Sequence, residues 1–580
     1  MFSKILIANR GEIAARIVRS CRELGIESVV IHSDADSGSL AVRTADHAVN
    51  LGAGPAAENY LNIPAVIAAA VNSGAQAIHP GYGFLSENPE FAAAVEGAGL
   101  TFIGPSAQAI RVMGGKVEAR KVAVQAQVPL APGSDGPVSS ADAVEAFGAE
   151  HGYPVLVKAS AGGGGRGMRR INTQAEAQEA FDAAVREATA AFGNGEVYLE
   201  RYLTNSRHVE VQILADRHGQ VVYVGDRDCS VQRRHQKLIE ESPAPGLSAQ
   251  MRRDMGESAI RLAKAVDYVG AGTVEFLVEE DKFYFLEMNT RIQVEHPVTE
   301  MVHGVDLIAE QIKVASGAEL SIQDRLEPAG AAVEARINAE DVAGGLFLPA
   351  PGPIAGLTVP SGEGIRFDAG YEQGDEVLPY YDSLIGKLIA FGSDREQAIE
   401  RLTVALQELK IEGVETTIPA ALAVLKHDDF RQTRFNTLWL ESTVDFSESE
   451  EDRQQVEVGG RYYLIPTFSD FGVHGGYGVG EVQAPGAATV LSGRKSSSRR
   501  AVAVSDGSIK APMQGTIVKI NVASGDQVAK GDVLFVLEAM KMENPLTAPF
   551  DGVIGEVTAE IGQSLAAGTI LTTVEELVTA

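Results

Sequence analysis

Short apolar runs alternate with amphipathic segments at the start of the chain. Residues 4–8 form an apolar run that predicts a buried strand. A helix should follow the loop at residues 9–11, because apolar side chains then recur at helical spacing (Ile13, Ile17, Cys21 and Leu24). The alternation continues through residues 28–32, 63–71 and 77–79. We therefore expect a doubly wound α/β domain with a parallel sheet over about residues 1–115.

A period of two marks a later hairpin. Residues 273–278 and 283–287 read as strands joined by a short acidic turn, and pairing about Asp281 puts Glu275 opposite Glu287. Asn289 returns to the same face two residues on. Opposed carboxylates repel unless a cation lies between them, and Mg²⁺ carried by a nucleotide fits that place. The alternative is a solvated acidic edge.

A glycine-rich loop lies between two further apolar segments. Residues 162–167 contain a formal G-x-G-x-x-G, but residues 154–158 and 168–171 on either side both read as strands. The dinucleotide-binding motif requires a helix after the loop. A glycine loop on a hairpin can instead fold over a polyphosphate, and Lys158 can add a charge to it. The alternative is a flexible linker.

The C-terminal part contains an internal repeat. Several positions recur 37 residues later, as from Gly525 to Gly562 and from Leu534 to Leu571. A strand pattern repeated in this way predicts two copies packed face to face in an all-β domain. Lys541 stands between the copies, flanked by Met540 and Met542. We expect it on an exposed turn.

The region between about residue 445 and the repeat has a different composition. Residues 445–451 are acidic and serine-rich, residues 470–486 glycine-rich and residues 494–500 basic. Such segments bury too little apolar surface to order fully. Residues 456–465 resemble a hairpin that turns on Gly459 and Gly460. We expect a linker over 446–507 with a possible small β docking element.

Composition and charge narrow the class of protein. A chain of 580 residues should hold several domains. The net charge of −29 argues against nucleic acid and anionic membrane surfaces as partners. Two cysteines, no evident signal peptide and no apolar stretch of membrane-spanning length favour a cytoplasmic protein.

One segment supplies local positive charge in this acidic chain, and a second reads as a loop of an active site. Residues 227–237 concentrate arginine, histidine and lysine, and residues 289–297 read as an active-site loop without regular periodicity. Anionic ligands such as a nucleotide require such groups. The alternative for the first segment is a solvated charged face.

Together these motifs resemble the biotin carboxylases of the ATP-grasp superfamily over about residues 1–445, and a biotinyl carrier domain over 508–580. The motifs are residues 7–14, 79–88, 162–168, 232–237, 287–297, 336–341 and 538–544. Their order resembles the alpha subunit of actinobacterial-type acyl-CoA carboxylases. The resemblance implies a multidomain α/β protein: an N-terminal domain (1–115), an ATP-grasp domain (116–335) with a mobile lid (about 129–203), a C-terminal carboxylase domain (336–445), the linker, and a barrel-sandwich carrier.

The resemblance also implies a set of site residues. ATP would be bound by Lys116, Lys158, Gly163, Gly164, Gly165, Glu200, Leu203, His208, Gln232, His235, Glu275 and Glu287. About two Mg²⁺ or Mn²⁺ ions would be held by Glu275, Glu287 and Asn289. Bicarbonate would be held by Lys237, Arg291, Gln293, Val294 and Glu295. Glu295 would be the general base, Arg336 would stabilise the enolate of the biotin ureido ring, and Lys237 and Arg291 would assist catalysis. Biotin would be covalent on Lys541.

The sequence departs from the family pattern at Ala161, where a further glycine is usual, and at Arg201, where lysine often follows the glutamate. Neither departure removes a proton carrier or a metal ligand. The implied partners are a separate carboxyltransferase beta subunit, a second copy of the carboxylase domain, and a biotin protein ligase that binds transiently. The competing interpretations are a lipoyl carrier, another ATP-grasp ligase and a carrier protein without enzyme activity.

Overall fold

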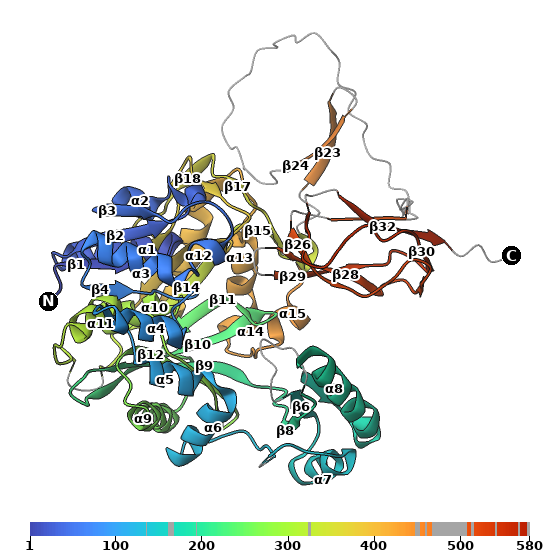
Figure 1. The fold of residues 1–580 in the computed structure, drawn as a ribbon, viewed down its shortest axis with the longest axis horizontal. Helices are drawn as coiled ribbons and strands as arrows, with labels where there is room; N and C mark the ends of the chain where they lie inside the picture. Colours follow the sequence, from blue (N-terminus) through green and yellow to red (C-terminus); the bar gives the residue numbers. More distant parts are fainter. Residues whose placement is uncertain are drawn as a thin grey trace, which may run out of the picture. The chain divides into compact units, whose positions relative to one another are not determined.

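The computed structural model describes residues 1–134, 136–159, 168–192, 194–322, 326–446, 453–458, 461–466, 507–511, 515–539, 542–565 and 569–576. They belong to two compact units (Figure 1). The first comprises Met1–Val342, Ala350–Leu378 and Ser383–Val444. The second comprises Ala343–Pro349, Pro379–Asp382 and the described residues from Asp445 onward. Among the described helices, none has both the length and the apolar composition needed to cross a bilayer.

The chain begins with a five-stranded parallel sheet in the order β3-β2-β1-β4-β5. Its strands are β1 (Lys4–Ile7), β2 (Glu27–His32), β3 (His47–Asn50), β4 (Ala77–His79) and β5 (Thr101–Phe102). Its helices are α1 (Gly11–Glu23), α2 (Leu40–Thr44), α3 (Ile63–Ser73), α4 (Pro89–Gly97) and α5 (Ala107–Gly114). Ile13, Ile17 and Cys21 of α1 are buried as predicted, whereas Leu24 caps the helix. The expected doubly wound sheet is confirmed.

The segment after α6 (Lys116–Gln125) folds around a core of its own. A three-stranded sheet, in the order β7-β6-β8, joins β6 (Val155–Ala159), β7 (Met168–Ile171) and β8 (Val197–Arg201). Helices α7 (Ala141–His151) and α8 (Ala177–Phe192) contribute to that core. Strands β6 and β7 pair antiparallel, which confirms the predicted strands on both sides of the glycine loop. The loop itself, with Gly163, Gly164 and Gly165, lies outside the described residues.

An eight-stranded sheet forms the centre of the first unit, in the order β13-β12-β9-β10-β11-β14-β21-β19. The strands are β9 (Arg207–Ala215), β10 (Val221–Arg233), β11 (Gln236–Ser242), β12 (Gly270–Glu279), β13 (Lys282–Asn289), β14 (Ala331–Asn338), β19 (Ile365–Ala369) and β21 (Leu384–Gly392). Strand β14 pairs with both β11 and β21. The sheet therefore continues through position 335, where the sequence suggests a domain boundary.

The remaining elements of the first unit surround this sheet. The helices are α9 (Ala249–Ala265), α10 (His296–His303), α11 (Leu307–Ala315), α12 (Arg395–Glu408), α13 (Ile418–Lys426), α14 (Asp428–Arg431) and α15 (Trp439–Thr443). Two small antiparallel sheets pair β17 (Gly352–Pro353) with β20 (Glu376–Val377) and β18 (Gly356–Thr358) with β22 (Lys410–Glu412).

The second unit contains two four-stranded sheets related by the sequence repeat. One has the order β25-β32-β30-β27 and the other β29-β28-β26-β31. The strands are β25 (Ser508–Lys510), β26 (Gly515–Ile520), β27 (Gln527–Val528), β28 (Val533–Ala539), β29 (Met542–Thr547), β30 (Gly552–Ile554), β31 (Ser564–Leu565) and β32 (Ile570–Glu576). Moving β26, β27 and β28 along by the repeat gives β30, β31 and β32, so each sheet maps onto the other.

Hydrogen bonds repeat with the same offset. Gly525 N donates to Ile554 O at 2.8 Å, and Gly562 N donates to Ile517 O at 2.7 Å. Both glycines have positive φ, 91° and 86°, a conformation that favours glycine. Lys541 follows β28 and precedes β29 in the sequence, outside the described residues. The predicted linker hairpin is present as β23 (Arg453–Val458) paired with β24 (Arg461–Pro466).

Candidate active site

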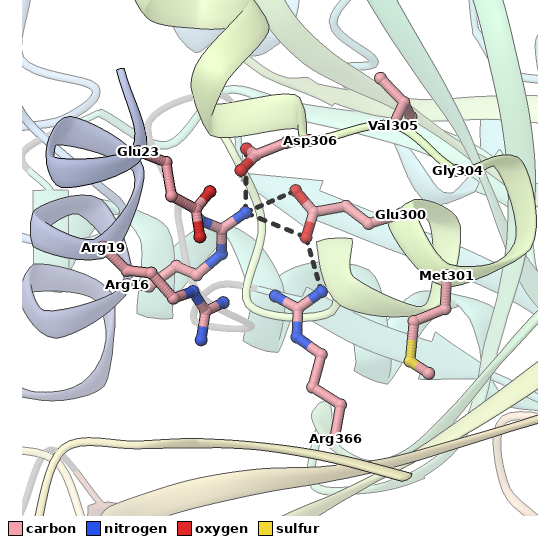
Figure 2. A pocket seen from close by; sticks show the side chains of 9 residues that line it. All are labelled: Arg16, Arg19, Glu23, Glu300, Met301, Gly304, Val305, Asp306 and Arg366. Atoms are coloured by element: carbon pink, nitrogen blue, oxygen red, sulfur yellow. Dashed lines mark hydrogen bonds and ion pairs between the residues drawn. The ribbon is translucent and has the colours of Figure 1, made fainter. Parts of the chain in front are cut away.

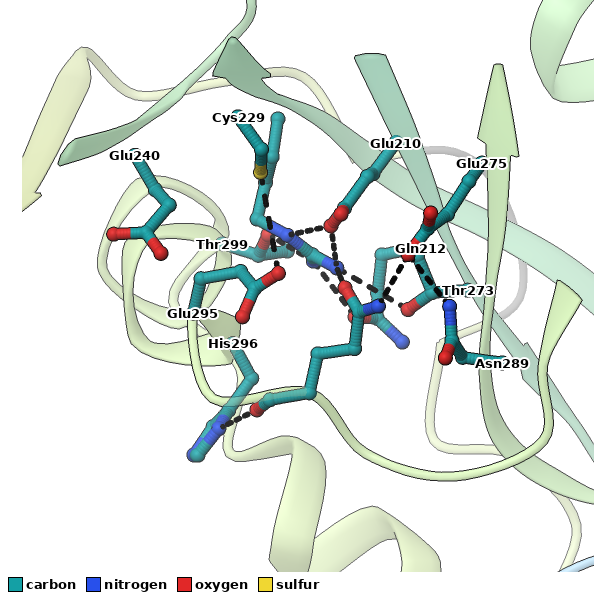
Figure 3. Close-up of polar contacts among 12 residues, drawn as sticks. Glu210, Gln212, Cys229, Glu240, Thr273, Glu275, Asn289, Glu295, His296 and Thr299 are labelled. Atoms are coloured by element: carbon teal, nitrogen blue, oxygen red, sulfur yellow. Dashed lines mark hydrogen bonds and ion pairs between the residues drawn. The ribbon is translucent and has the colours of Figure 1, made fainter. Parts of the chain in front are cut away.

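Polar side chains alternate along neighbouring strands of the eight-stranded sheet. On β9, His208, Glu210 and Gln212 are buried and spaced by two residues, so they share one face. Arg227 on β10, Lys237 on β11 and Glu275 on β12 contact Glu210 or its neighbours. A buried polar network therefore crosses several strands (Figure 3).

Glu275 and Glu287 are directly opposite each other on β12 and β13, which confirms the predicted pairing. The register shifts between Glu275 and Phe276, which the sequence did not reveal. Glu275 is buried and Glu287 is exposed. Desolvation and the charge of Glu275 raise the pKa of Glu287. Burial opposes ionisation of Glu275, but Lys237 and His208 outweigh it and hold its pKa well below the ordinary value.

Two amides converge on the same carboxylate. Asn289 Nδ2 donates to Glu275 Oε1 at 2.6 Å, and Gln293 Nε2 donates to the same oxygen at 2.9 Å. His208 Nε2 lies 3.0 Å from Glu275 Oε2. Burial disfavours the charged imidazole, yet Glu275 raises the pKa of His208 above its ordinary value. Both carboxylate oxygens of Glu275 therefore have partners that stabilise its negative charge.

Glu295 lies between two cations. Lys237 Nζ donates to Glu295 Oε1 at 2.7 Å, and Arg336 Nη2 donates to Glu295 Oε2 at 2.8 Å. Burial alone would raise the pKa of Glu295, but Lys237, Arg336 and Arg227 hold it well below the ordinary value. The carboxylate is therefore ionised at neutral pH, as a proton acceptor must be.

Arg336 also binds a second buried carboxyl. Its Nε donates to Glu240 Oε1 at 2.5 Å. Glu240 faces Glu334 across β11 and β14, and both are fully buried. Burial, opposed by Arg336, raises the pKa of Glu240 to about 7. Burial and the neighbouring Glu240 raise the pKa of Glu334 well above its ordinary value, although Lys387 opposes that rise.

Arg227 connects the strands beneath the site. Its guanidinium is fully buried and contacts Glu210 Oε2 at 3.1 Å. It also donates to Gln293 Oε1 at 3.1 Å, on the loop that leads to Glu295. Further hydrogen bonds go to Gln212, Thr273 and Thr299. Because a buried charge must be fully paired, Arg227 fixes these elements relative to each other.

Of the remaining predicted residues, some lie beside this network and others on the separate three-stranded sheet. Arg291 Nε lies 2.8 Å from Glu87 Oε2, and its Nη2 donates to Asn289 Oδ1 at 3.0 Å. On the separate three-stranded sheet, Lys158 Nζ donates to Glu200 Oε2 at 2.6 Å. Lys116 begins α6, Leu203 follows β8, Gln232 is buried on β10, and His235 is exposed in the turn before β11. Val294 offers its carbonyl to Lys387 Nζ at 2.8 Å.

The residues present fit a divalent cation. Glu275 and Glu287 offer carboxylate oxygens from adjacent strands, and hard cations such as Mg²⁺ prefer oxygen ligands. Their mutual repulsion would be relieved by such an ion. Asn289 lies beside them, but it presents its nitrogen to Glu275 and its oxygen to Arg291. Its part in binding an ion stays a prediction.

An open pocket lies on another side of α10 (Figure 2). Arg16 on α1 lies 2.9 Å from both Glu300 and Asp306, and Arg366 on β19 lies 2.8 Å from Glu300. These ion pairs tie α1 and β19 to α10, the helix that begins directly after Glu295.

The sequence assigned no role to several residues near the site. Glu210, Glu240 and Lys387 were not singled out at all, whereas Glu12, Glu87 and Arg227 lie in segments that the sequence singled out without a role for these residues. A signal was present for Glu210, because His208, Glu210 and Gln212 alternate with valines, as expected for one polar strand face. Lys387 gave no such signal, since its strand reads as an apolar core strand.

The chain matches known families along most of its length. Residues 1–110 match the family described as "Biotin carboxylase, N-terminal domain", and residues 115–323 match "Carbamoyl-phosphate synthase L chain, ATP binding domain". Residues 334–442 match "Biotin carboxylase C-terminal domain", and residues 507–574 match "Biotin-requiring enzyme". The predicted fold class is confirmed, while the predicted boundaries stay predictions.

Individual relatives agree with these families. The biotin-dependent acyl-coenzyme A carboxylase alpha3 subunit of Mycobacterium leprae is 46% identical, over 94% of each chain. A Campylobacter jejuni biotin carboxylase structure is 47% identical, with a TM-score of 0.72, over 76% of this chain and 99% of that one. The biotin carboxylase domain dimer of Hydrogenobacter thermophilus 2-oxoglutarate carboxylase, in complex with MgADP, ADP and bicarbonate, is 46% identical, with a TM-score of 0.70, over 76% and 97%. The chain therefore belongs to the biotin carboxylase family, among the alpha subunits that join a biotin carboxylase and a biotinyl carrier in one polypeptide.

Proposed function

We propose that this chain uses ATP, Mg²⁺ and bicarbonate to carboxylate biotin held on Lys541. The position of Glu295 carries the proposal, because an ionised carboxylate between Lys237 and Arg336 suits proton abstraction from a bound anion. The related dimer from Hydrogenobacter thermophilus contains MgADP and bicarbonate, which supports the same ligands here.

In this proposal the residues around Glu275 bind the nucleotide and its metal. Mg²⁺ would be held by Glu275 and Glu287, with Asn289 beside them, and would neutralise phosphate charge. ATP would be bound by the residues predicted above, with Lys158 turning from Glu200 to a phosphate. The glycine loop would cover the polyphosphate.

Bicarbonate would lie against Lys237, Arg291, Gln293 and the backbone of Val294. Its arrival brings a negative charge to Lys237, which weakens the attraction between Lys237 and Glu295 and raises the proton affinity of Glu295. Glu295 then takes the bicarbonate proton as the bicarbonate oxygen attacks the terminal phosphorus and ADP leaves. The product, carboxyphosphate, provides CO₂ and phosphate.

Biotin would supply the ureido nitrogen that bonds to CO₂, and the proton of that N–H would pass to the phosphate released from carboxyphosphate. Arg336 would hold the ureido oxygen as it gains negative charge, a task for which its fixed guanidinium is suited. Glu240 and Glu295 both bind Arg336, so its position is set from two sides.

We further propose a separate carboxyltransferase beta subunit that acts on an acyl-CoA, acetyl-CoA or propionyl-CoA. The name of the Mycobacterium leprae relative, an alpha subunit of an acyl-CoA carboxylase, supports this partner. Only about 62 residues (446–507) separate the predicted carboxylase and carrier parts, fewer than the typical 100–150 of a domain. The chain then needs a biotin protein ligase to modify Lys541. Self-association of the carboxylase part is supported by the dimeric relative from Hydrogenobacter thermophilus. We also propose that the protein acts in the cytoplasm.

Purified chain tests this proposal directly. ATP hydrolysis should require bicarbonate and Mg²⁺ and should rise with free biotin, and peptide mass mapping should find biotin on Lys541. Lys541→Arg should lose the modification, while Lys530→Arg, at an exposed lysine of the same unit, should keep it. Malonyl-CoA or methylmalonyl-CoA should form only after a carboxyltransferase is added. Hydrolysis independent of bicarbonate, or lipoate on Lys541, would refute the assignment.

A further inference from the structure

Lys387 and Glu12 form a buried ion pair that has no part in the chemistry above. Lys387 Nζ lies 2.9 Å from Glu12 Oε1, and the two side chains are 0% and 1% exposed. Desolvation of two charges costs more than their attraction returns unless further polar bonds complete the arrangement. The partners of this pair therefore indicate what it holds.

Lys387 directs its hydrogen bond at the loop that precedes Glu295. Its Nζ donates to the carbonyl of Val294 at 2.8 Å. Glu12 Oε2 accepts from the Tyr82 hydroxyl at 2.6 Å, whereas Glu12 Oε1 has no directed hydrogen bond among the described residues. Glu12 thus holds Lys387 by charge, and Lys387 holds the Val294 peptide by a hydrogen bond.

The Val294 carbonyl controls the position of Glu295. The carbonyl of Val294 and the N–H of Glu295 belong to one planar peptide unit. Fixing the carbonyl direction therefore fixes the backbone from which the Glu295 side chain reaches Lys237 and Arg336. Gln293, one residue earlier, is held separately by Arg227. Two separate contacts therefore hold the loop, one at Gln293 and one at Val294.

The residues that hold the Val294 peptide in place come from distant parts of the chain. Glu12 lies in the first turn of α1, Tyr82 lies after β4, and Lys387 lies on β21. Gly370 packs on the start of α1, where a Cβ on this glycine would lie 2.5 Å from Glu12 N. No side chain fits at position 370, so the Gly370 backbone packs directly against the residues that begin α1.

We propose that Lys387 and Glu12 are positioning residues for the bicarbonate half of the reaction. Lys387 orients the Val294–Glu295 peptide, and Glu12 keeps Lys387 in place. The inference rests on the proposed function, because it takes Glu295 as the base. Both residues act through Val294, so their loss should weaken the use of bicarbonate and leave ATP binding intact.

The test uses the full-length chain with a neutral replacement of the pair, Lys387→Met with Glu12→Gln. Replacing both charges avoids a single unpaired buried charge, which is strongly destabilising. Asp368, opposite Lys387, keeps its partner Arg366. The matched control is Arg252→Met with Asp226→Asn, an ion pair that joins α9 to β10. Glu12→Asp is the milder variant, because it keeps both charges but withdraws the carboxylate.

We expect kcat/KM for bicarbonate to fall by about 10²-fold in the double variant, as for a small misplacement of reacting groups. The Kd of a non-hydrolysable ATP analogue should stay within about twofold, and Glu12→Asp should show a smaller loss in the same direction. Unchanged use of bicarbonate, or an equal loss of ATP binding, overturns the proposal. If the double variant does not fold, Glu12→Asp decides by the same two measurements. Wild-type hydrolysis without bicarbonate would instead refute the proposed function, before any variant is compared.

Discussion

Glu275 and Glu287 are cross-strand partners on β12 and β13; Glu275 is buried within the polar network, and Glu287 is exposed to solvent. Directly opposed like charges destabilise a sheet. A cation bound between the two carboxylates would relieve this repulsion. This relationship leads to the first prediction.

Glu287→Gln should abolish the metal-dependent part of nucleotide binding. With an ATP analogue, Mg²⁺ should raise the Tm of the wild-type chain, because a ligand at about 100 times its Kd stabilises by about 2.7 kcal/mol. In the variant, Mg²⁺ should add little. Without nucleotide and metal, the variant should be at least as stable as wild type, since the repulsion with Glu275 is gone. Glu257→Gln, at an exposed position on α9, is the control, and an Mg²⁺ response equal in both variants would contradict the assignment.

Glu295→Gln should lower kcat by about 10²–10⁴-fold, the usual contribution of general-base catalysis. The variant keeps the shape of the side chain but cannot take a proton. Lys237 and Arg336 lose one negative partner, so bicarbonate binding should not weaken. Steady-state kinetics with varied bicarbonate, together with calorimetric binding of an ATP analogue, separate these effects. A normal kcat would exclude Glu295 as the base.

The residues that the sequence predicted well are those set by local periodicity. Glu275, Glu287 and Asn289 follow from alternation along one hairpin. The register shift beside Glu275 does not, because a bulge depends on how neighbouring strands twist. Lys237, Arg336 and Glu295 were proposed from the family resemblance, and the structure shows them in contact.

Contacts across the sheet could not be predicted in this way. Lys387 and Glu12 are in contact although they lie far apart in the sequence of the first unit. Nothing in the residues around Lys387 indicates that it is a buried lysine that binds a backbone carbonyl. Likewise, Glu240 and Glu334 become partners only because β11 pairs with β14. The second unit is the opposite case, since its repeat in the sequence predicted the relation between its two sheets.

Glu240→Gln should change how stability depends on pH. In the folded chain the pKa of Glu240 is raised to about 7, above an unfolded value of about 4.3. Between these values the folded state binds more protons than the unfolded state, so this group makes the wild type less stable as pH rises. The Tm of the variant relative to wild type should therefore increase from about pH 4.5 to about pH 7 and then level off. A pH-independent difference in Tm would contradict the raised pKa.

Gly525→Ala and Gly562→Ala should destabilise the second unit by similar amounts. Both glycines have positive φ, and an added Cβ would meet no atom within 4 Å at either position. The cost is then backbone strain alone, roughly 1–2 kcal/mol each. Calorimetry of the full chain should show this loss in the transition of the second unit only. Ala523→Gly is a control for the same turn, and strongly unequal effects would contradict the symmetry.

The three-stranded sheet with α7 and α8 should move as one body when nucleotide binds. Its apolar core, including Val144, Val157 and Leu199, is made of residues from its own segment. Its contacts with the central sheet include the hydrogen bond from Phe285 N to Pro129 O and the ion pair of Arg201 with Glu279. A body with its own core can rotate about such a limited connection without unfolding.

Closure would exclude water from carboxyphosphate, and reopening would release ADP. Amide exchange over residues 155–171, including the glycine loop, should therefore slow with an ATP analogue. Exchange in α12, far along the central sheet, should stay unchanged, and equal protection with and without nucleotide would show that the segment does not close.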